Sequence, residues 1–269
     1  MRTIIIGVGY TGRRVLALLP AAEAVGIRRN ELDLDQPSPG RLGLPQSYRL
    51  LYTVPPRETA DGDPRLELLL SLLDPAPHRF VYLSTSGVYG DRNGDTVTED
   101  DAPAPETDRA RRRLAAEALL SDWCRNTGTE LVILRVPGIY GPGRLGLDRI
   151  EARIPVIAEK DAHPGNRIHV DDLAACCLRA LDGAAPPGIY NVGDGDHRSG
   201  SAFSRAVARL AGLAEPREIP FAVAQQAFGE ARLSFLRESR IVDTTRMREI
   251  LGFMPRYSEP EDGIRASLE

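Results

Sequence analysis

The chain has 269 residues, a net charge of −4 and 34 basic residues, of which 33 are Arg and one is Lys. A Walker A loop needs a Lys directly after its glycines, and the single Lys160 lies in Ala-Glu-Lys-Asp, which excludes a P-loop NTPase. The acidic balance argues against a nucleic-acid partner, no apolar run is long enough for a membrane span, and three cysteines without disulfide or CxxC spacing predict a cytoplasmic protein without a metal.

The first half of the chain alternates between predicted strands and helices. We expect strands at 3–7, 23–27, 50–54, 79–84 and 130–135, and helices at 13–19, 65–73 and 107–126. Residues 30–47 are expected to form an irregular connection with room for one short strand, and residues 91–105 a polar loop. The alternation indicates βαβ units, and so an α/β fold with a Rossmann-type, doubly wound parallel sheet.

The second half has a different character. A turn-rich loop at 137–143 precedes a strand at 167–170, a helix at 171–182, a strand at 188–192 and helices near 201–213, 224–236 and 244–251. We predict a Rossmann domain over 1–142, to which segments near 165–192 return. Residues 143–269 are expected to form most of a smaller α+β substrate-binding part. No flexible linker separates the two.

The motif Gly7-x-Gly9-x-x-Gly12 lies between the first strand and the first helix. Gly7 permits a tight turn, Gly9 lets the backbone approach a pyrophosphate, and Gly12 lets the helix pack close to the strand. Tyr10 and Thr11 lie in the same loop, at a helix N-terminus whose N–H groups and dipole favour phosphate. The motif predicts a dinucleotide site; the alternative is a glycine-rich turn that binds nothing.

The residues after the second strand bear on the choice of cofactor. Arg28 and Arg29 follow Ile27, and an Arg here can meet the 2′-phosphate of NADP(H) with charge-assisted hydrogen bonds. We therefore favour NADP(H). NAD(H) remains the alternative, in which the two arginines are solvated and Glu31 or Asp33 binds the ribose.

Six segments together resemble the extended short-chain dehydrogenase/reductase group, the NAD(P)-dependent epimerase/dehydratase family. They are Gly-Val-Gly-Tyr-Thr-Gly at 7–12, Tyr-Leu-Ser-Thr-Ser-Gly-Val-Tyr-Gly at 82–90, Leu-Arg-Val-Pro-Gly-Ile-Tyr-Gly-Pro-Gly-Arg at 134–144, Arg-Ile-His-Val-Asp-Asp-Leu-Ala at 167–174, Ile-Tyr-Asn-Val at 189–192 and Ile-Leu-Gly-Phe-Met-Pro-Arg-Tyr at 250–257. They occur in the family's order and cover nearly the whole chain. The resemblance implies oxidoreductase- or epimerase-like activity on an unidentified small molecule or nucleotide sugar.

The resemblance also implies roles for single residues. Beside the cofactor it places Thr53, Val54, Pro55 and Ser84, and along the nicotinamide Pro137, Gly138 and Ile139. Thr85, with Ser84 and Ser86 on either side, is at the position whose hydroxyl polarises the substrate in the family. Tyr140, Tyr89 and His169 are open between structural roles and proton transfer. Relatives often dimerise through the helix at 107–126, so a homodimer is also expected.

The chain departs from the family where chemistry is concerned. The family's Tyr-x-x-x-Lys pair is missing: register against Arg-Leu-Ala-Ala-Glu-Ala-Leu-Leu at 113–120 puts Arg113 at the Lys position and Arg109 at the Tyr position. Arg is too basic for acid–base work. Arg113 is still expected at the ribose or phosphate, unless these arginines form a solvated helix face.

The residues after Thr85 are also unusual. Ser86-Gly87 replaces the Asp-Glu pair that sugar-nucleotide dehydratases use, which argues against that reaction. The pattern resembles the atypical, YeeZ-like branch of the family. Two hypotheses remain: an enzyme in which Thr85, Ser86, Tyr89 or Tyr140 is a non-standard proton donor, and a catalytically inactive NADP(H) sensor or regulatory module.

Overall fold

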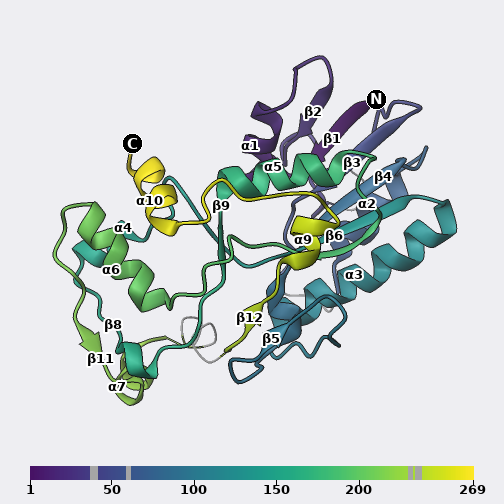
Figure 1. Ribbon diagram of the computed structural model, residues 1–269. Coiled ribbons are helices and arrows are strands. Elements are labelled where there is room, and N and C mark those ends of the chain that lie inside the picture. Colours follow the sequence, from purple (N-terminus) through teal and green to yellow (C-terminus); the bar gives the residue numbers. More distant parts are fainter. Residues whose placement is uncertain (37–41, 59–61, 230–232, 234–237) are drawn as a thin grey trace.

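Six parallel strands form the main sheet, which lies in the part of the molecule on the right of Figure 1. The structure is a computed structural model that describes residues 1–36, 42–58, 62–229, 233 and 238–269. Across the sheet the strands are β2 (Ala24–Ile27), β1 (Arg2–Ile6), β3 (Tyr48–Tyr52), β4 (Arg79–Thr85), β6 (Glu130–Val136) and β10 (Gly188–Asn191). Every neighbouring pair is parallel. The expected doubly wound parallel sheet is therefore confirmed.

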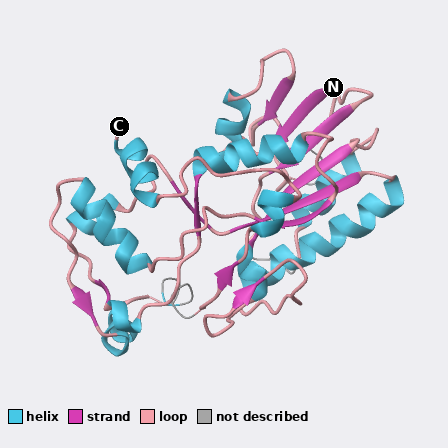
Figure 2. Ribbon diagram, viewed as in Figure 1, coloured by secondary structure: helices cyan, strands magenta, loops and turns pink. Residues whose placement is uncertain are grey.

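Helices cover both faces of this sheet (Figure 2). One face packs against α1 (Tyr10–Ala17) and α5 (Val170–Leu181), and the other against α2 (Pro64–Leu72) and α3 (Asp108–Thr127). Because successive side chains on a strand point to opposite faces, Ile5 joins the core under α1 and α5 while Ile4 and Ile6 join the core under α2 and α3. This burial on both sides explains the continuous apolar runs in the sequence.

The position of β1 between β2 and β3 determines where a ligand can bind. From β1 the chain first moves to one side of the sheet and then crosses to the other. The connections that leave the carboxyl ends of β1 and β3 diverge at this point, which opens a crevice. The glycine motif directly follows β1, so the topology places it at this crevice.

The strands and helices predicted for the first half are all present. Their ends differ by one or two residues, except that α1 begins at Tyr10, three residues before the predicted start at 13. The short strand allowed within 30–47 is missing from the described part of that connection, 30–36 and 42–47. The polar loop at 91–105 contains the two-residue strand β5 (Thr96–Val97), which pairs with β12 (Ile241–Val242). This pairing joins segments that are far apart in the sequence. A strand of two residues is too short to show an alternating pattern, so the sequence did not predict it.

The second half builds a smaller body beside the carboxyl ends of the strands (Figure 1). Its elements are α4 (Leu147–Glu151), β8 (Val156–Ile157), η2 (Glu159–Asp161), α6 (Gly200–Leu210), β11 (Glu218–Ile219), α7 (Phe221–Ala227) and α10 (Pro260–Leu268). The helix expected at 224–236 is represented by α7, and residues 230–232 and 234–236 of that prediction lie outside the described residues. Tyr140, Leu145, Val207 and Ile264 belong to the core of this body.

Two further connections tie this body to the sheet. The short strands β7 (Gly138–Tyr140) and β9 (Arg167–His169) pair in parallel, and α9 (Thr245–Glu249) corresponds to the helix expected at 244–251.

Two residue types occur once in the chain. Trp123 lies on α3, and its ring centroid is 6.5 Å from that of Phe80. Lys160 is exposed in η2 of the smaller body. No helix in the described ranges has the length and apolar character to cross a membrane.

Candidate functional site

The three glycines of the loop after β1 meet different surroundings. Gly7 has φ +96°, and a Cβ there would lie 2.8 Å from Thr53 Oγ1, whose hydroxyl donates a hydrogen bond to the Gly7 carbonyl. A Cβ on Gly12 would overlap that same carbonyl oxygen. A Cβ on Gly9 would meet no protein atom within 4 Å. Gly7 and Gly12 are thus required by packing, whereas the space beside Gly9 is free for a ligand.

A cavity of about 1090 Å³ lies over this loop and the carboxyl ends of the strands. The predicted site residues that line it are Gly7, Gly9, Tyr10, Thr11, Arg28, Arg29, Thr53, Val54, Pro55, Ser84, Arg113 and Ile139. The predicted residues absent from its lining are Gly12, Thr85, Ser86, Pro137, Gly138 and Tyr140. The cavity has the size of a site for a small molecule or cofactor.

The N-terminus of α1 faces this cavity without a side-chain cap. Gly9 is the N-cap residue, and no side chain accepts a hydrogen bond from the first turn. The first N–H groups of a helix have no partner within the helix, so they are available to an anion. Together with the free space beside Gly9, this fits the pyrophosphate of a dinucleotide.

Charged side chains gather at the end of β2. Arg29 forms ion pairs with Asp33 (3.4 Å) and Asp35 (3.0 Å), and Arg65 binds Asp35 through two nitrogens, each at 2.8 Å. The hydrogen bonds from Arg65 lower the pKa of Asp35. Arg28 is exposed, and its guanidinium forms no ion pair with a described residue. The arginines at this end of the cavity therefore include one that is uncommitted.

At the other end, Ser84 belongs to a buried polar network. Its hydroxyl donates to Glu117 of α3, and Glu117 accepts two hydrogen bonds from Arg135 of β6. The side chains of Arg135 and Glu117 are 3% and 5% exposed. The Arg135 guanidinium also lies over the ring of Tyr89. The network joins the carboxyl ends of β4 and β6 to the middle of α3.

Thr85 and Ser86 follow Ser84 at the end of β4. Thr85 Oγ1 accepts a hydrogen bond from the Gly87 N–H (3.2 Å) and caps the short helix η1 (Ser86–Tyr89). The hydroxyl proton of Thr85 has no acceptor among the described residues, although Thr85 itself does not line the cavity. Thr85 pairs in register with Val136, which lines the cavity.

Arg113, at the position of the family's Lys, is fixed by the sheet. Its Nη1 donates to the Tyr82 hydroxyl (3.1 Å) and to the Leu83 carbonyl (2.8 Å), and the guanidinium lies 5.5 Å from the centre of the Tyr82 ring. Burial raises the pKa of Tyr82 to about 12, although Arg113 opposes the shift. Tyr82 is therefore a neutral hydrogen-bond partner, and Arg113 presents a fixed positive charge to the cavity.

Tyr140, Tyr89 and His169 are buried and do not line the cavity. The Tyr140 ring packs edge-on against His169 and Phe203, and burial raises the pKa of its hydroxyl. The Tyr89 hydroxyl donates to Asn191 (2.7 Å), and burial lowers the pKa of His169, which caps α5. These contacts favour the structural roles that the sequence left open for the three residues.

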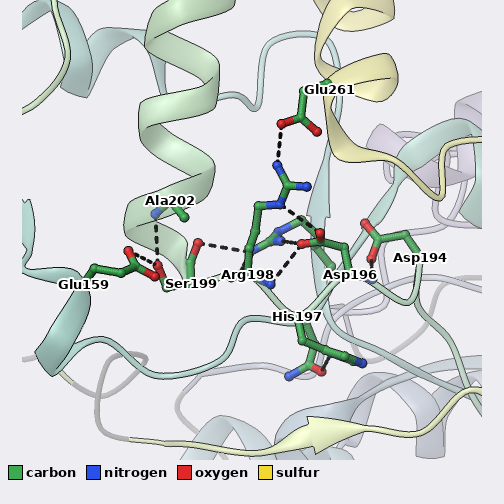
Figure 3. Close-up of polar contacts among 10 residues, drawn as sticks. Glu159, Asp194, Asp196, His197, Arg198, Ser199, Ala202 and Glu261 are labelled. Carbon is green, nitrogen blue, oxygen red and sulfur yellow. Dashed lines mark hydrogen bonds and ion pairs between the residues drawn. The ribbon is translucent and has the colours of Figure 1, made fainter.

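A second polar network fixes the loop after β10 (Figure 3). Arg198 bridges Asp196 (2.8 Å) and Glu261 (2.6 Å), while Ser199 binds Glu159 (2.9 Å) and caps α6. Burial raises the pKa of neighbouring Asp194 to about 7. No group of three His, Cys, Asp or Glu within the described residues could hold a metal ion. The Arg198–Glu261 ion pair joins this loop to α10, and the Ser199–Glu159 hydrogen bond joins the N-terminus of α6 to η2.

Several residues at the site were not identified from the sequence. Glu117, Arg135, Asp35 and Arg65 were missed, and Arg144 had no assigned role although it ends one of the family segments. One signal was present: Arg135 is the charged residue in the apolar strand Leu-Val-Ile-Leu-Arg-Val, which indicates a buried partner. Arg144 lines the cavity from the loop after β7, and only the fold brings that loop to Tyr10.

Comparisons with known proteins agree with this geometry. Residues 65–193 match the NAD dependent epimerase/dehydratase family. Protein YeeZ of Escherichia coli (strain K12) is 30% identical over 217 residues, which cover 78% of this chain and 72% of YeeZ. A structure of a functionally unknown conserved protein from Silicibacter pomeroyi has a TM-score of 0.85 at 28% identity, covering 99% and 97% of the two chains. Human epimerase family protein SDR39U1 with NADPH has the same fold: TM-score 0.75, 20% identity, 100% and 99% coverage.

Proposed function

This chain belongs to the NAD-dependent epimerase/dehydratase family, and from that premise we propose that it binds NADP(H) and acts as an oxidoreductase- or epimerase-like enzyme on a small molecule. The observation that carries the proposal is one continuous cavity that extends from the glycine loop and Arg28 at one end to Ser84 and Arg113 at the other. A dinucleotide needs phosphate contacts at one end and a reacting centre at the other, and this cavity offers both.

The chain's own residues suit each part of the cofactor. The N–H groups at the start of α1 and the space beside Gly9 suit the pyrophosphate, and Arg28 with Arg29 suits the 2′-phosphate. Thr53 to Pro55 line the wall of the cavity between these ends. A nicotinamide cofactor, when bound, supplies or accepts a hydride.

For the chemistry, the available hydroxyl of Thr85 supports a role in polarising a substrate carbonyl. Its oxygen is fixed by the Gly87 N–H, which leaves the O–H free to donate. Arg113 adds a positive charge that its hydrogen bonds to Tyr82 and Leu83 hold in place. A hydrogen-bond donor and a fixed cation both stabilise negative charge that develops on a carbonyl oxygen. Three buried, unpaired cysteines support the cytoplasmic location that we include in this proposal.

A second function, an NADP(H) sensor without turnover, is favoured by one specific observation. At the chemical end of the cavity, Ser84 is committed to Glu117 and Arg113 to the sheet, and both positions of the family's proton-transfer pair hold Arg. Such a protein would bind the dinucleotide and change shape or partner without reaction. The two functions differ in whether NADPH is consumed.

The test begins with fluorescence titration of NADPH and NADH, followed by assays of NADPH oxidation with small ketones, aldehydes and nucleotide sugars. We expect micromolar binding of NADPH and turnover of a carbonyl compound. Thr85→Ala is expected to lower kcat about 10²- to 10³-fold and leave the Kd for NADPH within about twofold, since it removes a donor to the developing oxyanion. Thr85→Ser, which keeps the hydroxyl, is the matched control and should retain most of the activity.

Each outcome separates the alternatives. Tight NADPH binding without oxidation of any carbonyl compound would favour the sensor. Turnover that survives Thr85→Ala at the wild-type rate would remove Thr85 from the mechanism. If neither dinucleotide binds to the folded wild type, both proposed functions are wrong.

A further inference from the structure

Arg144 lies in a loop of the smaller body that is built against the glycine loop. The hydroxyl of Tyr10 donates a hydrogen bond to the Pro142 carbonyl (3.0 Å). Gly141 has φ +148°, and a Cβ there would lie 2.6 Å from the same hydroxyl, so glycine is needed for the close approach. The contact between residues 141–144 and Tyr10 therefore determines where Arg144 is placed.

The ring of Tyr10 orients the guanidinium of Arg144. The Arg144 Cζ lies 3.9 Å from the ring centre, within the range of a cation–π contact. Arg14 lies near the same ring at 5.5 Å, but it is committed to an ion pair with Asp171 at 2.6 Å. Arg144, in contrast, forms no ion pair with a described residue. Its positive charge is held in place by the ring and has no counter-ion among the residues that the structure describes.

Arg144 also lines the cavity, and it does so from the loop after β7. It lines the cavity together with Gly9 and Tyr10, at the uncapped N-terminus of α1. A guanidinium is planar by electron delocalisation and can bind two oxygens of a phosphate at once, and the contact with the Tyr10 ring limits where this one can lie. The charge, orientation and location of Arg144 thus all suit an anion that rests on the glycine loop.

We propose that Arg144 binds the pyrophosphate of the dinucleotide and closes the cofactor site from the smaller body. The inference rests on the proposed function, because it assumes a dinucleotide on the glycine loop. Arg144 also lines a second cavity of about 400 Å³, together with Arg149 and Ser204. The other source of the same chemistry is therefore the phosphate of a substrate in that second cavity, and the experiment separates the two.

The experiment measures binding by isothermal titration calorimetry for NADPH, NADH, ADP-ribose, AMP and UDP. For Arg144→Ala we expect Kd values for NADPH, NADH and ADP-ribose to rise about 10- to 100-fold, since all three contain the pyrophosphate and lose charge-assisted hydrogen bonds. The Kd for AMP, which lacks the pyrophosphate, should change less than about threefold. Arg144→Lys keeps the charge but not the planar fork, and should recover part of the loss.

Arg149→Ala is the matched control, because Arg149 lines the second cavity and not the first. It should leave ADP-ribose binding unchanged, and thermal unfolding confirms that each variant is folded. Unchanged ADP-ribose binding in Arg144→Ala overturns the inference alone. Weaker UDP binding with unchanged ADP-ribose binding assigns Arg144 to a substrate phosphate and also overturns it. A wild type that binds neither dinucleotide nor ADP-ribose overturns the proposed function and, with it, this inference.

Discussion

The two ends of the cavity differ in how their polar groups are used. At the nucleotide end, the first turn of α1 has no side-chain cap, Gly9 borders open space, and Arg28 and Arg144 form no ion pair with a described residue. At the α3 end, Arg113 is bound to Tyr82 and Leu83, and Ser84 to Glu117. Donors without a protein partner are available to a ligand, whereas committed donors hold the fold together.

This difference explains why binding is easier to infer here than chemistry. At the nucleotide end, the hydrogen-bond donors have no protein partner among the described residues, so their charge and position indicate the kind of ligand that they can bind. At the α3 end, the hydroxyl proton of Thr85 has no acceptor among the described residues, but Thr85 itself is not part of the cavity lining. The following predictions test the contrast, starting with the largest expected effect.

The buried carboxylate of Glu117 provides the strongest test of the committed end. Glu117→Ala leaves Arg135 buried without its counter-ion, which we expect to destabilise the fold by about 3–5 kcal/mol and lower Tm by roughly 6–15 °C in thermal unfolding. The Kd for NADPH should change little at a temperature where the variant is folded. Asp122→Ala, which breaks an exposed ion pair with Arg125 on the same helix, should cost less than about 1 kcal/mol. If Glu117→Ala left Tm unchanged and abolished NADPH binding, Glu117 would serve ligand binding and not the stability of the fold.

Substitution of Gly12 and of Gly9, tested separately, gives the next largest expected effects, on stability and on affinity respectively. Gly12→Ala forces a Cβ onto the Gly7 carbonyl and is expected to destabilise the fold by about 1–3 kcal/mol, measured by urea unfolding. Gly9→Ala meets no protein atom, so its stability should match the wild type while the Kd for NADPH rises at least about tenfold. Wild-type affinity in Gly9→Ala would show that no ligand approaches this backbone.

The smallest expected effect concerns the preference for NADP(H) over NAD(H). Removing Arg28 and Arg29 together is expected to raise the Kd for NADPH about tenfold or more and that for NADH less than about threefold, because the 2′-phosphate distinguishes the two. Fluorescence titration of both cofactors measures this, and Arg125→Ala on the exposed face of α3 controls for a general change in charge. Equal losses for both cofactors would contradict the assignment to the 2′-phosphate.

The sheet and the glycine loop could be predicted because their signals are local. The apolar run from Thr3 to Ile6, followed by Gly7, predicts a strand and a turn within a few residues. The family segments then predict the order of the remaining strands and helices. Two residues that line the nucleotide end, Gly7 and Arg28, follow strand ends directly. Their place at the carboxyl edge of the sheet is therefore set by the topology alone.

The remaining features depend on contacts between distant segments. Glu117 and Arg135 are 18 residues apart and meet because α3 packs beside β6, and neither residue shows in sequence which partner it has. Tyr10 and Pro142 are 132 residues apart, so the role of Arg144 became visible only when the loop after β7 was placed. Short pairings such as β5 with β12 have too few residues for a pattern.

The single tryptophan and the single lysine allow the distance between the two parts of the molecule to be followed by resonance energy transfer. Trp123 lies on α3 in the sheet-based part, and Lys160 is exposed in η2 of the smaller body. Apart from the α-amino group, an amine-reactive dye has one attachment site, and it would accept energy from one indole. Movement of the smaller body toward the sheet when a nucleotide is added would change the transfer efficiency, without any engineered residue.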